Sequence, residues 1–152
     1  MVRFPEYQDV VEEMTRIAIE EMEHFGMVHK ELTKRGFQLG RERRDFYIRD
    51  LMTFFEGGGS RDMQFVDAMI FAAMIEARSC ERFRLLSEGI SDLSLRSFYR
   101  DLMISEAEHY TCFLRFAKKY SGQVDVDNRW KDFLHFEAQI MLKYGKSETM
   151  HG

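Results

Sequence analysis

The sequence predicts an all-α fold, a single domain built as a bundle of long helices, and two observations support this prediction. The chain holds one proline, Pro5, among its 152 residues, so its long stretches contain no strong helix breaker. Within those stretches apolar residues recur every three or four positions, which is the spacing of one buried helix face. Because the length is that of one domain, we expect residues 1–152 to share one core.

The first helix is expected from about residue 5 to residue 35. Pro5 suits the first turn of a helix, and the next breaker is Gly36, at the position where a glycine commonly ends one. Glu21 and His24 fall within the apolar stripe of this helix, so two ionisable groups face the core. The apolar members of the stripe are Met14, Ile17, Ala18, Phe25, Val28 and Leu32.

A long glycine-bracketed connection, residues 37–60, separates this helix from the next. Gly40 and the run Gly57-Gly58-Gly59 enclose a short apolar segment that contains Phe46 and Leu51. We expect one short helix there. A connection of this length lets the two long helices on either side run parallel, as the long crossover of some four-helix bundles does.

The next two helices are predicted to form an antiparallel hairpin. Ser60 can cap a helix that runs to about Ser87 and is ended by Gly89. Ser91 or Asp92 can then cap the second helix of the hairpin. The connecting turn is short, so the two helices should lie side by side.

An extra C-terminal helix completes the predicted bundle. The second hairpin helix runs to about Tyr120, and the last amphipathic stretch extends from about Asp127 to Lys143. A polar tail follows. No low-complexity segment suggests a second domain.

Composition excludes several classes of protein. The net charge is −4, from 22 Lys and Arg against 26 Asp and Glu, so any contact with nucleic acid must use a local basic patch. No apolar run reaches the roughly 18 residues that span a bilayer, and the N-terminus has no secretory signal. We therefore expect a cytoplasmic protein with no membrane partner. Cys80 and Cys112 are expected to be small buried apolar residues.

Two Glu-x-x-His motifs, Glu21 with His24 and Glu106 with His109, stand in apolar helix stripes. Residues three apart project from one helix face, so each motif offers a carboxylate and an imidazole together. Glu76 and Glu106 lie about equally far from the hairpin turn near residue 90, which predicts that they face each other.

Glu81 is the other acidic candidate on the first hairpin helix. It lies nearer the turn and falls off the main stripe, so we expect it to pair with a neighbouring arginine, Arg78, Arg82 or Arg84. Glu76 is therefore the predicted partner of the second motif.

The predicted metal ligands are Glu21, His24, Glu76, Glu106 and His109. Carboxylates and imidazoles with open positions suit iron or manganese, and bridging glutamates hold two metals about 3.5–4 Å apart. This is the ligand set of the ferritin-like di-iron carboxylate bundles. Chance placement is the alternative, but burying so many ionisable groups without a metal is costly. No catalytic side chain beyond the ligands is predicted.

One ligand of the bundle pattern is missing. The spacing between Glu76 and Glu106, counted back from Glu21, falls before Met1. The sequence thus predicts a chain without the helix that carries this glutamate. Glu137 on the last helix is an alternative source of the carboxylate.

The chain resembles the tRNA 2-methylthio-N6-isopentenyladenosine hydroxylase (MiaE-type) family over nearly its whole length. The specific string is Glu-Ala-Arg-Ser-Cys-Glu-Arg-Phe, residues 76–83, and the match continues through residues 20–25, 57–60, 98–100 and 105–110. The resemblance implies a ferritin-like bundle with two non-haem iron ions, held by the five predicted ligands. It also implies hydroxylation of the isopentenyl group beside the tRNA anticodon, with dioxygen as co-substrate and an external electron donor as partner.

Basic residues are the candidates for contact with tRNA, although acidic residues interleave with them and a mixed-charge solvated surface is the alternative. The candidates are Lys30, Lys34, Arg35, Arg41, Arg43, Arg44, Lys118 and Lys119. The Phe-rich and Met-rich stripes either seat the prenyl group or form plain core. Two other functions stay open: a ferritin- or rubrerythrin-like protein that oxidises iron or reduces peroxide, and a truncated bundle without catalysis.

Overall fold

The protein is described from a computed structural model that covers residues 3–41, 45–55 and 58–144. It divides into two compact units, residues 1–44 and residues 45–152. The single core predicted for residues 1–152 therefore stays a prediction.

The first unit contains one long helix, α1 (Gln8–Lys34). The expected start at Pro5 is wrong, because Pro5 lies in a turn before the helix. The expected end is confirmed. Gly36 has a φ of +76°, a conformation that costs glycine little, and the chain closes back through a bond from the amide of Phe37 to the carbonyl of Leu32.

Two residues of the predicted α1 core stripe, Ala18 and Phe25, are exposed. Phe25 is 54% exposed and stacks on His29, with 6.4 Å between the ring centroids. The two side chains lie four residues apart, so they meet on one helix face. Phe25 was placed in the core because its spacing fits the stripe, but its ring is turned to solvent.

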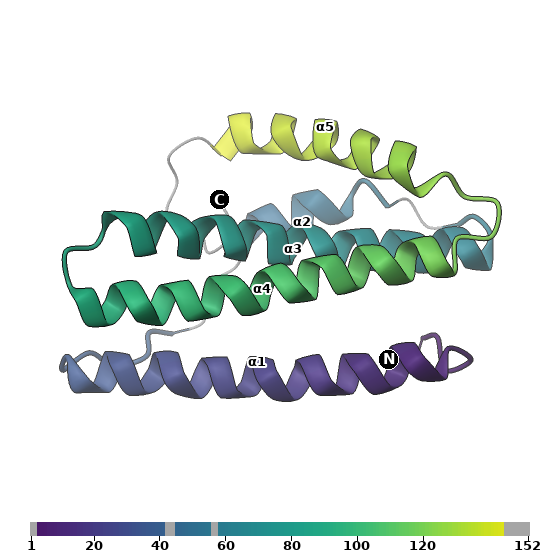
Figure 1. The fold of residues 1–152 in the computed structure, drawn as a ribbon. Helices are drawn as coiled ribbons and strands as arrows, with labels where there is room; N and C mark the ends of the chain where they lie inside the picture. Colours follow the sequence, from purple (N-terminus) through teal and green to yellow (C-terminus); the bar gives the residue numbers. More distant parts are fainter. Residues whose placement is uncertain (1–2, 42–44, 56–57, 145–152) are drawn as a thin grey trace. The chain divides into compact units, whose positions relative to one another are not determined.

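The second unit contains α2 (Phe46–Met52), α3 (Arg61–Gly89), α4 (Leu93–Lys119) and α5 (Val126–Tyr144) (Figure 1). The described residues hold five helices and no strand, so the predicted all-α class is confirmed. The short helix expected in the connection is α2. None of the described helices is long and apolar enough to cross a membrane.

Helices α3 and α4 form the predicted antiparallel hairpin (Figure 1). Ser60 caps α3, its side chain accepting a hydrogen bond from the amide of Met63 at 3.1 Å. Asp92 caps α4, accepting from the amides of Ser94 and Leu95. These caps satisfy amides that have no partner within the helix. The hairpin turn therefore begins and ends where the sequence predicts, with Asp92 rather than Ser91 as the cap.

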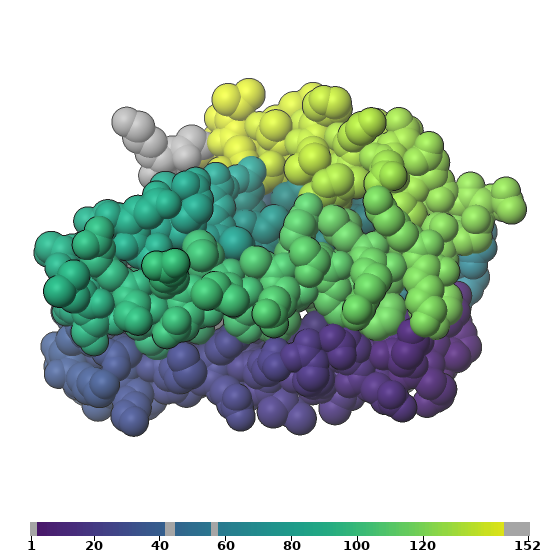
Figure 2. Space-filling model, viewed as in Figure 1, coloured from purple at the N-terminus to yellow at the C-terminus, as the bar shows by residue number. Residues whose placement is uncertain are grey.

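Helix α5 covers part of the hairpin, and its side chains lie against those of α3 and α4 (Figure 2). Phe133 is fully buried, with Phe54 and Phe55 at centroid distances of 5.0 and 4.8 Å. At the start of α5, Arg129 binds Asp67 of α3 at 2.9 Å. This packing holds the hairpin in one place relative to α5.

The Phe-rich and Met-rich stripes are plain core within this unit. Met69 of α3 and Phe113 and Phe116 of α4 are all buried. Such side chains fill the space between two facing helices and stabilise the hairpin by removing apolar surface from water. Their burial is what the interpretation as core predicts, and a role in seating the prenyl group stays a prediction.

Candidate metal centre

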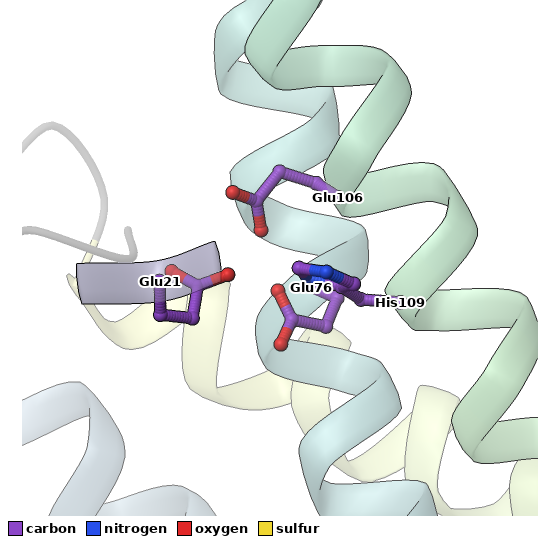
Figure 3. A group of neighbouring side chains, drawn as sticks. All are labelled: Glu21, Glu76, Glu106 and His109. Atoms are coloured by element: carbon purple, nitrogen blue, oxygen red, sulfur yellow. The ribbon is translucent and has the colours of Figure 1, made fainter. Parts of the chain in front are cut away.

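Glu76 of α3 and Glu106 and His109 of α4 form a cluster, called here the α3/α4 cluster. Each offers a ligand atom, and these atoms lie within 4.8 Å of one another. Figure 3 shows the three side chains extending to the same side of the two helices. The hairpin register brings Glu76, and not Glu81, to the level of Glu106.

The α3/α4 cluster is largely shielded from water. Glu106 is 4% exposed and His109 is fully buried, while Glu76 is partly buried. Two carboxylates this close repel each other when both are ionised, and burial strengthens the repulsion. A divalent cation between them would offset both costs. The donor set, carboxylate oxygens with one imidazole, is the set that iron accepts, so the residues present fit the predicted metal.

Glu21 and His24 lie on one face of α1, as their spacing predicts. The Nδ1 atom of His24 is 3.5 Å from Oε1 of Glu21. Their side chains are 17% exposed for His24 and 44% for Glu21. They belong to the first compact unit, and their membership of the metal site stays a prediction.

A buried ion pair joins α3 to α5 two residues beyond Glu76. Arg78 donates from Nε and Nη2 to the two carboxylate oxygens of Glu137, at 2.7 and 2.6 Å. Tyr47 of α2 donates its hydroxyl to the same carboxylate at 3.0 Å. Glu137 is 2% exposed, so this two-pronged contact satisfies a charge that would otherwise be expensive to bury.

The contacts with Glu137 also raise the pKa values of Tyr47 and Arg78. Burial and the charge of Glu137 raise the pKa of Tyr47, so that its hydroxyl stays protonated and donates. The hydrogen bond to Glu137 raises the pKa of Arg78. Sequence reasoning missed this network. The one sequence feature that indicated it was the position of Glu137 in the apolar stripe of the last helix. That position is equally compatible with a metal ligand.

The carboxylate of Glu137 thus has a structural role, since it holds α5 to α3. Both of its oxygens accept hydrogen bonds from Arg78, and it does not join the residues that could share a metal ion in the described part of the chain. The structure therefore gives no support to Glu137 as a substitute ligand.

The family model described as tRNA-(MS2IO6A)-hydroxylase (MiaE) matches residues 1–152. The chain belongs to this family. It is 32% identical over 126 residues to the tRNA 2-(methylsulfanyl)-N(6)-isopentenyladenosine(37) hydroxylase of Pseudomonas putida (strain KT2440), covering 83% of this chain and 60% of that protein.

A second MiaE relative, with the same description, comes from Salmonella typhimurium (strain LT2). It is 29% identical over 144 residues, which cover 95% of this chain and 52% of the relative. The chain thus spans little more than half the length of the curated relatives that it matches.

A solved structure supports the fold of this MiaE-family chain. Protein 43 with aldehyde deformylating oxygenase activity from Synechococcus matches with a TM-score of 0.83 and 28% identity, over 93% of this chain and 69% of the other. The match confirms the predicted all-α, ferritin-like helical bundle. That bundle is a fold in which metal sites form between facing helices.

Two residues that follow Glu76 on α3, Glu81 and Cys80, have different surroundings. Glu81 pairs with Arg78, which confirms its predicted structural role. Cys80 is only partly buried, unlike Cys112, which is 6% exposed. Burial and the charge of Glu106 raise the pKa of the Cys80 thiol.

Several of the predicted tRNA-contacting residues are engaged with acidic or aromatic neighbours. Lys34 and Arg35 both pair with Glu31, and Lys118 pairs with Asp127 at 2.7 Å. The ammonium of Lys119 lies 5.1 Å from the ring centroid of Tyr120. Such pairs are what the mixed-charge interpretation predicts.

The remaining candidates fall into two groups. Lys30 and Arg41 are exposed, as a docking residue must be. Arg43 and Arg44 lie outside the described residues. A role in tRNA binding stays a prediction for the whole set.

Proposed function

We propose that this protein is a non-haem di-iron monooxygenase that hydroxylates the isopentenyl group of 2-methylthio-N6-isopentenyladenosine next to the tRNA anticodon. The observation that carries the proposal is the buried α3/α4 cluster in a chain of the MiaE family. Carboxylates and an imidazole that converge in a shielded place fit redox metal ions.

The proposed ligand set has two halves. Glu76, Glu106 and His109 supply the first, and Glu21 and His24 of α1 supply the second. The support for the second half is its spacing and its geometry within α1, where the carboxylate and the imidazole already face each other at 3.5 Å. The proposal requires residues 1–152 to work as one domain.

The chemistry assigned to the site is an oxygen insertion. When bound, the two iron ions would supply the activation of dioxygen. One oxygen atom enters a C–H bond of the prenyl group, and the other leaves as water with two protons and two electrons from an external donor. The residues of this chain hold the metals and keep water away from the reacting carbon. The burial of Glu106 and His109 supports this role.

tRNA binding is proposed to use exposed cations, of which Lys30 and Arg41 are two described examples. Phosphate contacts of this kind release counterions, so affinity should fall steeply between low and moderate salt. Affinity that does not change with salt would contradict these residues as the docking surface. A titration of labelled tRNA at several salt concentrations measures this.

A direct test is conversion of tRNA that carries 2-methylthio-N6-isopentenyladenosine. The iron-loaded protein, dioxygen and a reductant should convert the nucleoside to a product heavier by one oxygen atom, detected by mass spectrometry after digestion. His109→Ala is the matched inactive control. An iron-loaded protein that yields no hydroxylated nucleoside, yet oxidises iron or consumes peroxide without RNA, would overturn the proposal in favour of the ferritin-like alternative.

A further inference from the structure

A groove lies between α3 and α4 beside the metal cluster, with a volume of about 360 Å³. Small residues, Ala77 and Ala107, form part of its lining together with Cys80 and Tyr110, and Glu81 and Arg84 are its charged members. All six residues belong to the second compact unit.

Helix geometry places this groove next to the ligands. Cys80 lies one turn after Glu76 on the same face of α3, and Tyr110 lies one turn after Glu106 on the same face of α4. A molecule in the groove would therefore lie close to the metal cluster.

The lining is suited to a short apolar chain. Two methyl groups, a thiol and an aromatic ring offer no strong hydrogen-bond donor or acceptor apart from the tyrosine hydroxyl. The volume exceeds the roughly 150 Å³ that suffices for benzene in an apolar cavity, and it falls within the usual range of small-ligand pockets. A bulky residue in place of either alanine would remove much of this space.

Of the two charged members, Arg84 can contact an anionic partner, because Glu81 is paired with Arg78. The Arg84 side chain is 51% exposed, and its nearest carboxylate, on Glu88, is 3.5 Å away and itself 60% exposed. Such a loose surface pair is worth little, so the guanidinium can turn to a phosphate. An apolar lining with one available arginine complements a nucleotide whose base carries a hydrocarbon chain.

We propose that this groove receives the isopentenyl side chain of the modified adenosine, with Ala77 and Ala107 setting the space for it and Arg84 contacting a neighbouring phosphate. The inference rests on the proposed function and deepens it by naming residues that determine specificity. It differs from the expectation that Phe-rich or Met-rich stripes seat the prenyl group, since those stripes form the core.

The test compares binding of two RNA stem-loops to the metal-free protein, measured by fluorescence anisotropy. One carries 2-methylthio-N6-isopentenyladenosine and the other carries unmodified adenosine. The wild-type protein should prefer the modified RNA by at least about tenfold, because the buried hydrocarbon adds affinity. Ala77→Leu and Ala107→Leu should each abolish this preference.

Controls separate the possible outcomes. Ala138→Leu changes an exposed alanine of α5 in the same way and should keep the preference. Circular dichroism and the iron content of each variant show whether it folds. If Ala77→Leu does not fold, Ala107→Leu alone provides the test.

Either of two results would overturn the inference. If the preference persists in folded Ala77→Leu and Ala107→Leu, the prenyl group binds elsewhere and the proposed function stands. If the wild-type protein shows no preference and no hydroxylation when iron-loaded, both proposals fail together.

Discussion

The two Glu-x-x-His motifs are alike in sequence and differ in surroundings. On α4, Glu106 and His109 are almost completely buried, and Glu76 of the facing helix completes a three-residue cluster. On α1, the same spacing leaves Glu21 with a side chain 44% exposed. Spacing thus places a carboxylate and an imidazole on one face, whereas the facing helix decides whether they become a shielded metal site.

The supporting structure also distinguishes the two motifs. Near the α3/α4 cluster, the ion pair of Arg78 and Glu137 ties α3 to α5. Because Glu76 lies on α3, this ion pair fixes the helix that carries one of the ligands. We therefore expect the α4 motif to dominate metal binding.

The largest expected effect is on iron content. His109→Ala should lose nearly all of the approximately two irons per chain that a di-metal site holds, because the cluster then has no imidazole. His24→Ala should retain about one, since the α3/α4 cluster stays intact. Metal analysis of the two purified variants measures this, and equal losses would show that the two motifs contribute alike.

A second effect concerns stability. Arg78→Leu should lower the free energy of unfolding by about 3 kcal/mol, because it leaves the buried carboxylate of Glu137 without its cation. Urea denaturation measures the change. Arg100→Leu, on the exposed side of α4, is the control and should change stability by no more than about 0.5 kcal/mol. A similar small loss for Arg78→Leu would mean that the pair does not hold α3 in place.

A third effect appears at high pH. The pKa of Tyr47 is raised in the folded protein from the ordinary value of 10.0, so the folded state keeps a proton that the unfolded state releases. Its stabilising contribution is complete below pH 10 and is lost as the pH rises toward the folded pKa, by up to about 1.4 kcal/mol per pH unit. Urea unfolding from pH 9 to 11 should show a shallower decline in Tyr47→Phe, and parallel curves would refute the assignment.

The smallest expected effect concerns the stability of the first turns of α1 and α4. Asp92 caps α4 through two amide hydrogen bonds, whereas Tyr7, which precedes α1, makes no side-chain cap hydrogen bond. Asp92→Ala should cost about 1 kcal/mol, with faster hydrogen exchange in the first turn of α4, approaching that of α1. Ser91→Ala, which removes the neighbouring hydroxyl, should leave exchange unchanged. An effect of equal size in both variants would argue against Asp92 as the cap.

Local patterns predicted the helices well because the signals that start and end a helix lie within a few residues of its ends. Ser60, Asp92 and Gly36 act where the sequence places them. The error at Pro5 is also local, since a proline suits a turn as well as a first helical position. Phe25 shows the limit of apolar periodicity. The spacing predicts which helix face a side chain lies on, but it does not predict whether that side chain is buried.

The sequence by itself determined the hairpin and, through its register, the choice of Glu76 over Glu81, because a short turn leaves two facing helices only one antiparallel alignment. Only the tertiary structure decided the role of Glu137. Its partners Arg78 and Tyr47 are 59 and 90 residues away, and no local pattern encodes a pairing between distant charges. The groove beside Ala77 and Ala107 was likewise invisible in the sequence, since the space between helices depends on how side chains from both of them pack.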